Sequence, residues 1–118
     1  MEAEIKYFHS PDIFDLDDYT PKTLDSFGFL LQVMIGVKGM DGEESFDMIV
    51  CTPEWLKVQM SCNDLILGLH YVFVKEYDFN RIKQKIEDYV RGINGENWNE
   101  IAQKLSFLGK WEFEDYKP

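Results

Sequence analysis

Hydrophobic and polar residues alternate in two early stretches of the chain, and this alternation predicts strands. Residues 3–8 (AEIKYF) have the period of a half-buried strand, with alternate positions on opposite faces. One face would hold Ala3, Ile5 and Tyr7, and the other Glu4, Lys6 and Phe8. Residues 27–38 form a longer run with an unbroken apolar face, which predicts a central strand. That face consists of Phe27, Phe29, Leu31, Val33, Ile35 and Val37.

The central strand is expected to belong to a hairpin, because residues 39–44 (GMDGEE) resemble a glycine-bearing turn and residues 45–52 alternate again. Between the first two strands, residues 12–26 show no clean period, and Pro11 and Pro21 interrupt this part of the chain. We therefore predict a long loop over 12–26. Loops of this length are often functional.

The rest of the chain has mainly helical patterns. Pro53 is suited to the first position of a short helix over 53–60, and the aromatic and β-branched residues of 69–77 predict a further strand. Asp78 is a suitable cap for a helix ending near Arg91. The apolar stripe of that helix would be Phe79, Ile82, Ile86, Tyr89 and Val90.

A second long helix is predicted to begin at Asn97, because Glu100 three residues later completes a capping-box pattern. Its buried stripe would be Trp98, Ile101, Ala102, Leu105 and Leu108. Residues 110–116 alternate once more and predict a short terminal strand. The order of elements indicates an α+β fold, with a mostly antiparallel sheet and the two C-terminal helices packed on one face. A single domain over residues 1–118 is expected from the length.

The chain is strongly acidic. Its 22 Asp and Glu residues outnumber 12 Lys and Arg, which gives a formal net charge of -10. The acidity is concentrated in residues 1–44, which hold 10 acidic and 3 basic residues, against 12 and 9 in residues 45–118. Because nucleic acids and anionic membranes are recognised by clustered basic side chains, we expect neither as a direct partner.

Residue types that commonly bind metals or act as nucleophiles are scattered along the chain. The metal-ligating types, His9, Cys51, Cys62 and His70, lack the paired spacing of zinc sites. The DLDD segment at 15–18 lacks the glycine and distal glutamate of a calcium loop. No serine lies in a Gly-x-Ser-x-Gly motif, and two cysteines do not make a disulfide framework. We predict reduced thiols, no metal, no cofactor and no catalysis.

Nothing in the sequence suggests export or membrane insertion. The first ten residues contain neither the basic nor the apolar region of a secretory signal, and no run approaches the roughly 20 apolar residues of a membrane span. A cytoplasmic protein is expected.

The predicted loop over 12–26 combines charge with aromatic residues. Phe14, Leu16 and Tyr19 lie among the five aspartates of this loop, although a surface needed only for solubility does not require aromatic side chains. Aromatic anchors surrounded by charge are typical of a binding surface. Tethering of Phe14 and Leu16 to the core is an equally good interpretation.

Four segments carry a resemblance to a known family: AEIKYFHSPDI, FGFLLQVMIG with GEESFD, VCTPEWL, and the terminal GKWEFEDY. Together, and in this order, they resemble the immunity protein 8 family of bacterial polymorphic toxin systems of the contact-dependent inhibition type. The resemblance implies a non-catalytic α+β protein that binds a toxin and neutralises it in the producing cell. Family motifs of this kind specify the fold and do not identify the contact surface.

Many toxins of such systems resemble nucleases, whose phosphate-binding sites are basic, so an acidic partner with aromatic anchors would complement them. On this argument, the toxin-binding residues are predicted at two acidic clusters. The candidates are Asp15, Asp17, Asp18, Tyr19 and Asp25 in the loop, and Asp41, Glu43 and Glu44 at the hairpin tip.

Two other functions are compatible with the sequence. An acidic interaction module, or a mimic of DNA, would bind several basic proteins in place of one toxin. A small enzyme using a pair of carboxylates is the third possibility, because sequence spacing says little about carboxylate separation in space.

Overall fold

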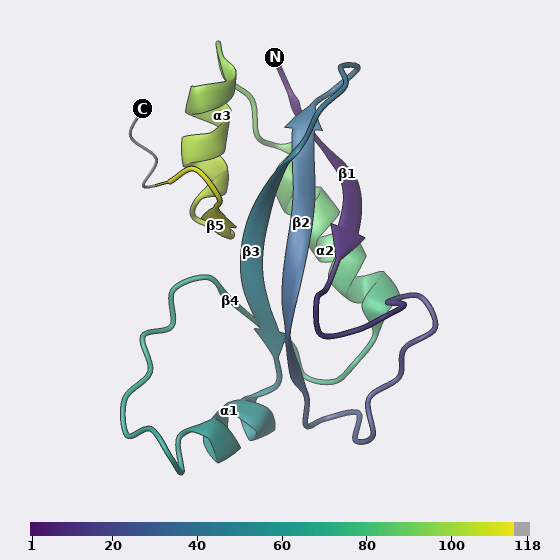
Figure 1. Ribbon diagram of the computed structural model, residues 1–118, viewed down its shortest axis with the longest axis vertical. Helices are drawn as coiled ribbons and strands as arrows, with labels where there is room; N and C mark the ends of the chain where they lie inside the picture. The colour runs from purple at the N-terminus through teal and green to yellow at the C-terminus, as the bar shows by residue number, and fades with distance from the viewer. Residues whose placement is uncertain (115–118) are drawn as a thin grey trace.

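A computed structural model describes residues 1–114 and confirms the α+β fold (Figure 1). The strands are β1 (Ala3–His9), β2 (Gly28–Val37), β3 (Glu44–Cys51), β4 (Tyr71–Phe73) and β5 (Lys110–Trp111). The helices are α1 (Pro53–Gln59), α2 (Phe79–Arg91) and α3 (Trp98–Leu105). Two predicted residues of the terminal segment, Asp115 and Tyr116, lie outside the described residues.

The sheet is mostly antiparallel, with β1, β2, β3 and β4 in that order. The predicted hairpin is confirmed: β2 pairs with β3 from Gly28 opposite Cys51 to Ile35 opposite Glu44. The edge of β3 that does not pair with β2 pairs with two short strands. β4 pairs parallel with its end, at 49–51, and β5 pairs antiparallel with its beginning, at 46–47.

One face of the sheet carries the core. Alternate residues of β2 are almost fully buried there, as the predicted apolar face requires, and their partners on β3 lie on the same side. Helices α2 and α3 contribute to the same cluster. Complete burial of each large aliphatic side chain stabilises the fold by about 1.5–3 kcal/mol. The central members are Phe29, Leu31, Val33, Ile35, Phe46, Met48, Val50, Ile82, Ile86, Val90, Ile101, Ala102 and Leu105. Tyr89, predicted in the buried stripe of α2, is exposed.

The predicted alternation of the first strand is wrong beyond Ile5, because β1 contains a bulge. Its register on β2 shifts between Ile5, which faces Ile35, and Tyr7, which faces Met34. A bulge adds one residue and reverses the faces that follow it. Phe8 therefore packs against the core, and Tyr7 is half exposed on the opposite face.

Two other predicted strands are too long. The strand expected over 69–77 is limited to the three residues of β4, and Tyr77 lies beyond it with its backbone N–H bonded to the carbonyl of Leu24. The terminal strand expected over 110–116 contains only the two residues of β5 before the chain turns. Both segments contact a short stretch of β3, and this limits the length over which they can pair.

The helix caps follow the sequence closely. The side chain of Asp78 accepts from Arg81 N, and Asn97 Oδ1 accepts from Glu100 N at 2.9 Å. The return bond of a capping box is displaced by one residue, since Glu100 accepts from the backbone of Glu96. Thr52 caps α1 and also accepts from Phe27 N, so one hydroxyl joins this helix to the beginning of β2.

Candidate functional site

The two predicted acidic clusters lie at opposite ends of the β2–β3 hairpin (Figure 1). The acidic loop, residues 12–26, precedes the beginning of β2, and the hairpin tip, residues 38–43, follows its end. The ten residues of β2 separate them by about 30 Å at the usual rise of a strand. The structure therefore does not bring the eight predicted residues together into one site.

The acidic loop is tethered to the core by apolar side chains. Ile13 is buried, and Leu16 and Tyr19 pack against the core cluster. The ring of Tyr19 lies edge-on to Phe29 and Tyr77, with centroids 6.2 and 5.4 Å away. Tyr19 therefore has a packing role that its place among charges did not indicate. Phe14, by contrast, is fully exposed.

Backbone contacts define the shape of this loop. Asp12 Oδ2 accepts from Leu30 N at 2.9 Å, so the carboxylate bonds to the β2 backbone beyond the last residue paired with β1. Asp15 Oδ1 accepts from Asp17 N at 3.0 Å and closes a local turn. A turn of this kind is one reason for aspartate in loops that is independent of binding.

The remaining loop carboxylates face solvent. Asp17 lies 3.6 Å from Lys83 Nζ and is still mostly exposed, and Asp18 and Asp25 are exposed as well. Asp25 lines an open cavity of about 490 Å³ together with Lys75 and with two glutamates, Glu54 and Glu76, that the sequence pattern did not single out. The negative charge at this end is therefore drawn from three separate segments of the chain.

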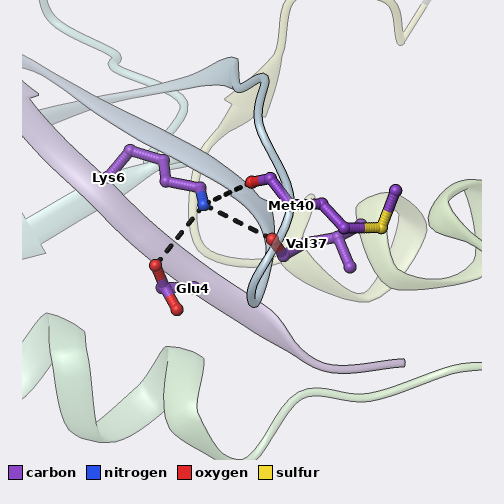
Figure 2. A network of polar contacts seen from close by, with 4 residues as sticks. All are labelled: Glu4, Lys6, Val37 and Met40. Carbon is purple, nitrogen blue, oxygen red and sulfur yellow. Dashed lines mark hydrogen bonds and ion pairs between the residues drawn. The ribbon is translucent and has the colours of Figure 1, made fainter.

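The hairpin tip is fixed by Lys6 on the neighbouring strand (Figure 2). Lys6 Nζ donates to the carbonyl of Met40 at 2.7 Å and to that of Val37 at 3.4 Å, and it pairs with Glu4 at 3.4 Å. The tip also folds back closely, since a Cβ atom at Gly36 would overlap the carbonyl oxygen of Gly42. Asp41 and Glu43 lie on this turn and are exposed.

Glu44, the third predicted residue at this end, has a different environment. Its Oε1 accepts hydrogen bonds from the indole N–H groups of both Trp98 and Trp111, the latter at 3.0 Å. These tryptophans belong to α3 and β5, so one carboxylate oxygen joins three elements. Glu44 is half-buried, and no ion pair connects it to a basic side chain within residues 1–114.

Glu44 also lines an open cavity of about 780 Å³, here called the aromatic cleft. Leu69 and Phe107 form exposed parts of its rim, with exposed fractions of 71% and 83%. His70 forms one side, where its Nε2 bonds the carbonyl of Ser106 at 2.7 Å. The complete lining is Glu44, Leu69, His70, Trp98, Asn99, Gln103, Ser106, Phe107, Trp111, Phe113 and Glu114.

The aromatic cleft adjoins the hairpin tip through shared lining residues. A second, smaller cavity is lined by Asp41, Glu43, Glu44 and Trp98, so Glu44 and Trp98 belong to both. The hairpin end of the molecule thus combines carboxylates with accessible aromatic surface. At the acidic loop, Phe14 alone provides a fully exposed aromatic side chain among residues 12–26.

Sequence reasoning missed the exposed apolar residues of the segment that leads to Leu69 on the cleft rim. In the segment between α1 and β4, Leu65 and Leu67 are 70% and 80% exposed, as Leu69 is on the rim. The sequence did contain a pattern that could have indicated them. Residues 65–69 (LILGL) are a run of apolar residues in a segment with neither a strand nor a helix period. Exposed apolar residues often belong to interaction surfaces where they form a large contiguous patch.

Two titratable groups are strongly perturbed, and both lie away from the cleft. Burial raises the pKa of the Cys51 thiol to about 11, which opposes formation of a nucleophilic thiolate. Burial, then the charges of Tyr19 and Asp17, raise the pKa of Tyr77 to about 12. The Tyr77 hydroxyl is buried and has no hydrogen-bond partner within the described part of the chain.

Three further observations concern metal ligands, buried polar residues and helix length. Residues 1–114 contain no cluster of three or more histidine, cysteine or acidic side chains suited to a metal ion. The buried polar residues in this range are Ser10, Ser45 and Thr52, so no carboxylate is among them. None of the helices in residues 1–114 has the length and apolar character needed to cross a bilayer.

Comparison with known proteins identifies a family. The family model described as immunity protein 8 matches residues 3–116, the family that the sequence motifs resemble. Neither the curated proteins nor the solved structures contain a match to this chain. The matched range includes the acidic loop, the hairpin tip and every residue lining the aromatic cleft.

Proposed function

The chain belongs to the immunity protein 8 family, which implies a toxin-neutralising role, and we propose that it performs this role by binding its cognate toxin through an acidic surface, without catalysis. The proposed partner is a toxin domain with a basic, phosphate-binding surface, as a nuclease has. Covering such a surface would exclude the substrate from it.

The observation that carries this proposal is the exposure of unpaired carboxylates. Of the eight predicted contact residues, Asp17 alone forms an ion pair with a basic side chain of residues 1–114. That pair is solvent-exposed on the Asp17 side, and exposed pairs of this kind contribute about 0–1 kcal/mol. Glu44 bonds two indoles and Asp15 closes a local turn, but the fold makes little internal use of the other predicted carboxylates.

An excess of exposed negative charge acts mainly on the rate of association. Complementary potentials bring a basic partner to the correct face, and they raise the association rate at low ionic strength far above the range for uncharged surfaces. Screening by salt removes this advantage over distances beyond about 8 Å at physiological ionic strength. Binding should accordingly be faster in low salt and should slow steeply as salt is added.

Two double charge reversals test the proposal and locate the surface. Asp17→Lys with Asp18→Lys alters the acidic loop, and Asp41→Lys with Glu43→Lys alters the hairpin tip. Each reversal changes the formal charge by two, so both variants move from -10 to -6, and each serves as the net-charge control for the other. Association and dissociation rates with the purified toxin domain are measured over a range of salt concentrations.

We expect one variant to associate about tenfold or more slowly than wild type at low salt, with a flatter salt dependence, and the other to change much less. The proposal is refuted if both variants keep the wild-type rate and salt dependence. Equal inhibition of several unrelated basic proteins by the wild-type chain would instead identify the general acidic interaction module. Rescue of toxin-expressing cells by co-expression provides the activity readout.

A further inference from the structure

Glu44 is unusual because it is half-buried and, among residues 1–114, its carboxylate is bonded by neutral donors alone. Both indole N–H groups bond to the same oxygen, Oε1. A carboxylate removed from water normally gains a cation or several donors, because its desolvation is costly. Within residues 1–114, no cation fills this role, and the chain as a whole carries a large excess of negative charge. The cleft therefore has negative charge available to a ligand.

The walls around this carboxylate are aromatic. Trp98, Trp111 and Phe113 line the cleft, and the ring of Phe113 lies edge-on to that of Trp111 with centroids 6.1 Å apart. Trp111 also stacks on the buried ring of Phe46. Aromatic faces attract cations, and a carboxylate next to such faces adds direct charge complementarity. A second carboxylate, Glu114, also lines the cleft.

The volume of the aromatic cleft and the side chains at its rim indicate what kind of ligand it can hold. A volume of about 780 Å³ is in the range of pockets that hold a substantial ligand group. The exposed side chains of Leu69 and Phe107 at the rim can bury further apolar surface and shield a polar contact inside from water. A long side chain projecting from another polypeptide matches this arrangement better than a small free ion does.

We propose that the aromatic cleft is an anchor site for an arginine side chain of the toxin. The planar guanidinium would stack on the aromatic walls and donate to Glu44 Oε2, while Oε1 keeps its two indole bonds. Arginine fits better than lysine, because its flat, weakly hydrated head both stacks on rings and donates to carboxylates. This inference rests on the proposed function for the identity of the partner, but its chemistry is testable without the toxin.

The test is a titration with N-acetyl-L-arginine amide, followed through the indole N–H signals in nitrogen–proton correlation spectra. N-acetyl-L-citrulline amide, which has nearly the same shape and no charge, is the ligand control. Trp55 is an internal reference, because it packs on Gly28 at the other end of β2. Saturable shifts of the Trp98 and Trp111 signals with the arginine compound, and not with citrulline or at Trp55, are the expected result.

Glu44→Gln keeps an oxygen acceptor for the indoles and removes the charge, so we expect at least tenfold weaker binding of the arginine amide. Glu43→Gln, an exposed carboxylate one residue away, is the matched control and should bind as wild type does. Phe107→Ala removes rim surface without touching the Glu44 bonds, and it replaces Glu44→Gln as the decisive variant if the latter does not fold.

Absence of saturable shifts overturns the proposal, as does equal binding of the citrulline and arginine compounds. Equal affinity of Glu44→Gln and wild type for the arginine amide also overturns it. The same variants are then measured against the toxin domain. Arginine-amide binding with no toxin binding at all would refute the proposed function and retain the site, whereas toxin binding unaffected by Glu44→Gln would reject the site as the toxin's anchor.

Discussion

Glu44 should be a major source of stability, because one oxygen of its side chain connects β3 to α3 and β5. The informative perturbation is Glu44→Leu, which preserves much of the side-chain volume and removes the acceptor. Hydrogen bonds to a charged group contribute about 1.5–3 kcal/mol each, so loss of two gives an upper limit of about 3–6 kcal/mol. Trp98 and Trp111 are only half-buried, so water can replace part of what is lost. We expect a decrease of about 2–3 kcal/mol in the free energy of unfolding.

Urea unfolding followed by far-ultraviolet circular dichroism measures this change, since tryptophan fluorescence would itself respond to the substitution. Glu44→Gln, which retains an oxygen acceptor, should lose about 1 kcal/mol. Glu43→Leu is exposed and unbonded to the indoles, so it should stay within about 0.5 kcal/mol of wild type. A Glu44→Leu variant as stable as Glu43→Leu would refute the reasoning.

A double-mutant cycle separates the indole bond from other effects of the leucine. Trp98→Phe removes one donor and keeps an aromatic ring against Phe46, whose centroid lies 6.3 Å from that of Trp98. In the Trp98→Phe background, Glu44→Leu leaves one indole N–H without its acceptor instead of two, and it should therefore be less destabilising. A coupling energy of about 0.5–3 kcal/mol is expected for residues in one hydrogen-bonded network.

Three further predictions follow from the buried groups. Tyr77→Phe removes a buried hydroxyl without a described partner, so we expect unchanged or higher stability, by up to about 1 kcal/mol, in thermal unfolding. In the folded protein at pH 8, iodoacetamide should modify the exposed Cys62 and not the buried Cys51, with both modified in urea, as read by mass spectrometry. The fold raises the pKa of Cys51 from 9.0 to about 11, so with rising pH the thiol ionises first in the unfolded chain. The free energy of unfolding should therefore fall as pH rises from 9 to 11. Cys51→Val should reduce that fall, as measured by urea titrations at fixed pH.

Local patterns predicted the elements that depend on local physics. The β2–β3 hairpin and the caps at Asp78 and Asn97 follow from side-chain period and from donors three residues away. The bulge in β1 does not, because it is a property of the pairing with β2 and leaves the alternation of AEIKYF unaltered. The exposure of Tyr89 and the shortness of β4 likewise depend on what packs beside them.

The candidate site was predictable only in part for the same reason. The exposed carboxylates at Asp41 and Glu43 could be found from charge and turn residues alone. The bonds of Glu44 join residues 54 and 67 positions apart, and no local pattern indicates them. Tyr19 was selected for its acidic neighbours in sequence, whereas its nearest aromatic neighbours in space are Phe29 and Tyr77.

The separation of the two acidic ends has consequences for how a toxin could be bound. A standard interface covers roughly 800 Å² on each partner, so a compact one is about 30 Å across and cannot be centred on both ends of β2. Exposed charges act mainly on association, whereas half-buried, aromatic-lined contacts act on dissociation. Under the proposed function, the hairpin end has both kinds of group, with Asp41 and Glu43 beside the cleft that contains Glu44. The acidic loop has charge with a single fully exposed ring, so the hairpin end is the better candidate for the contact surface and its double reversal for the slower variant.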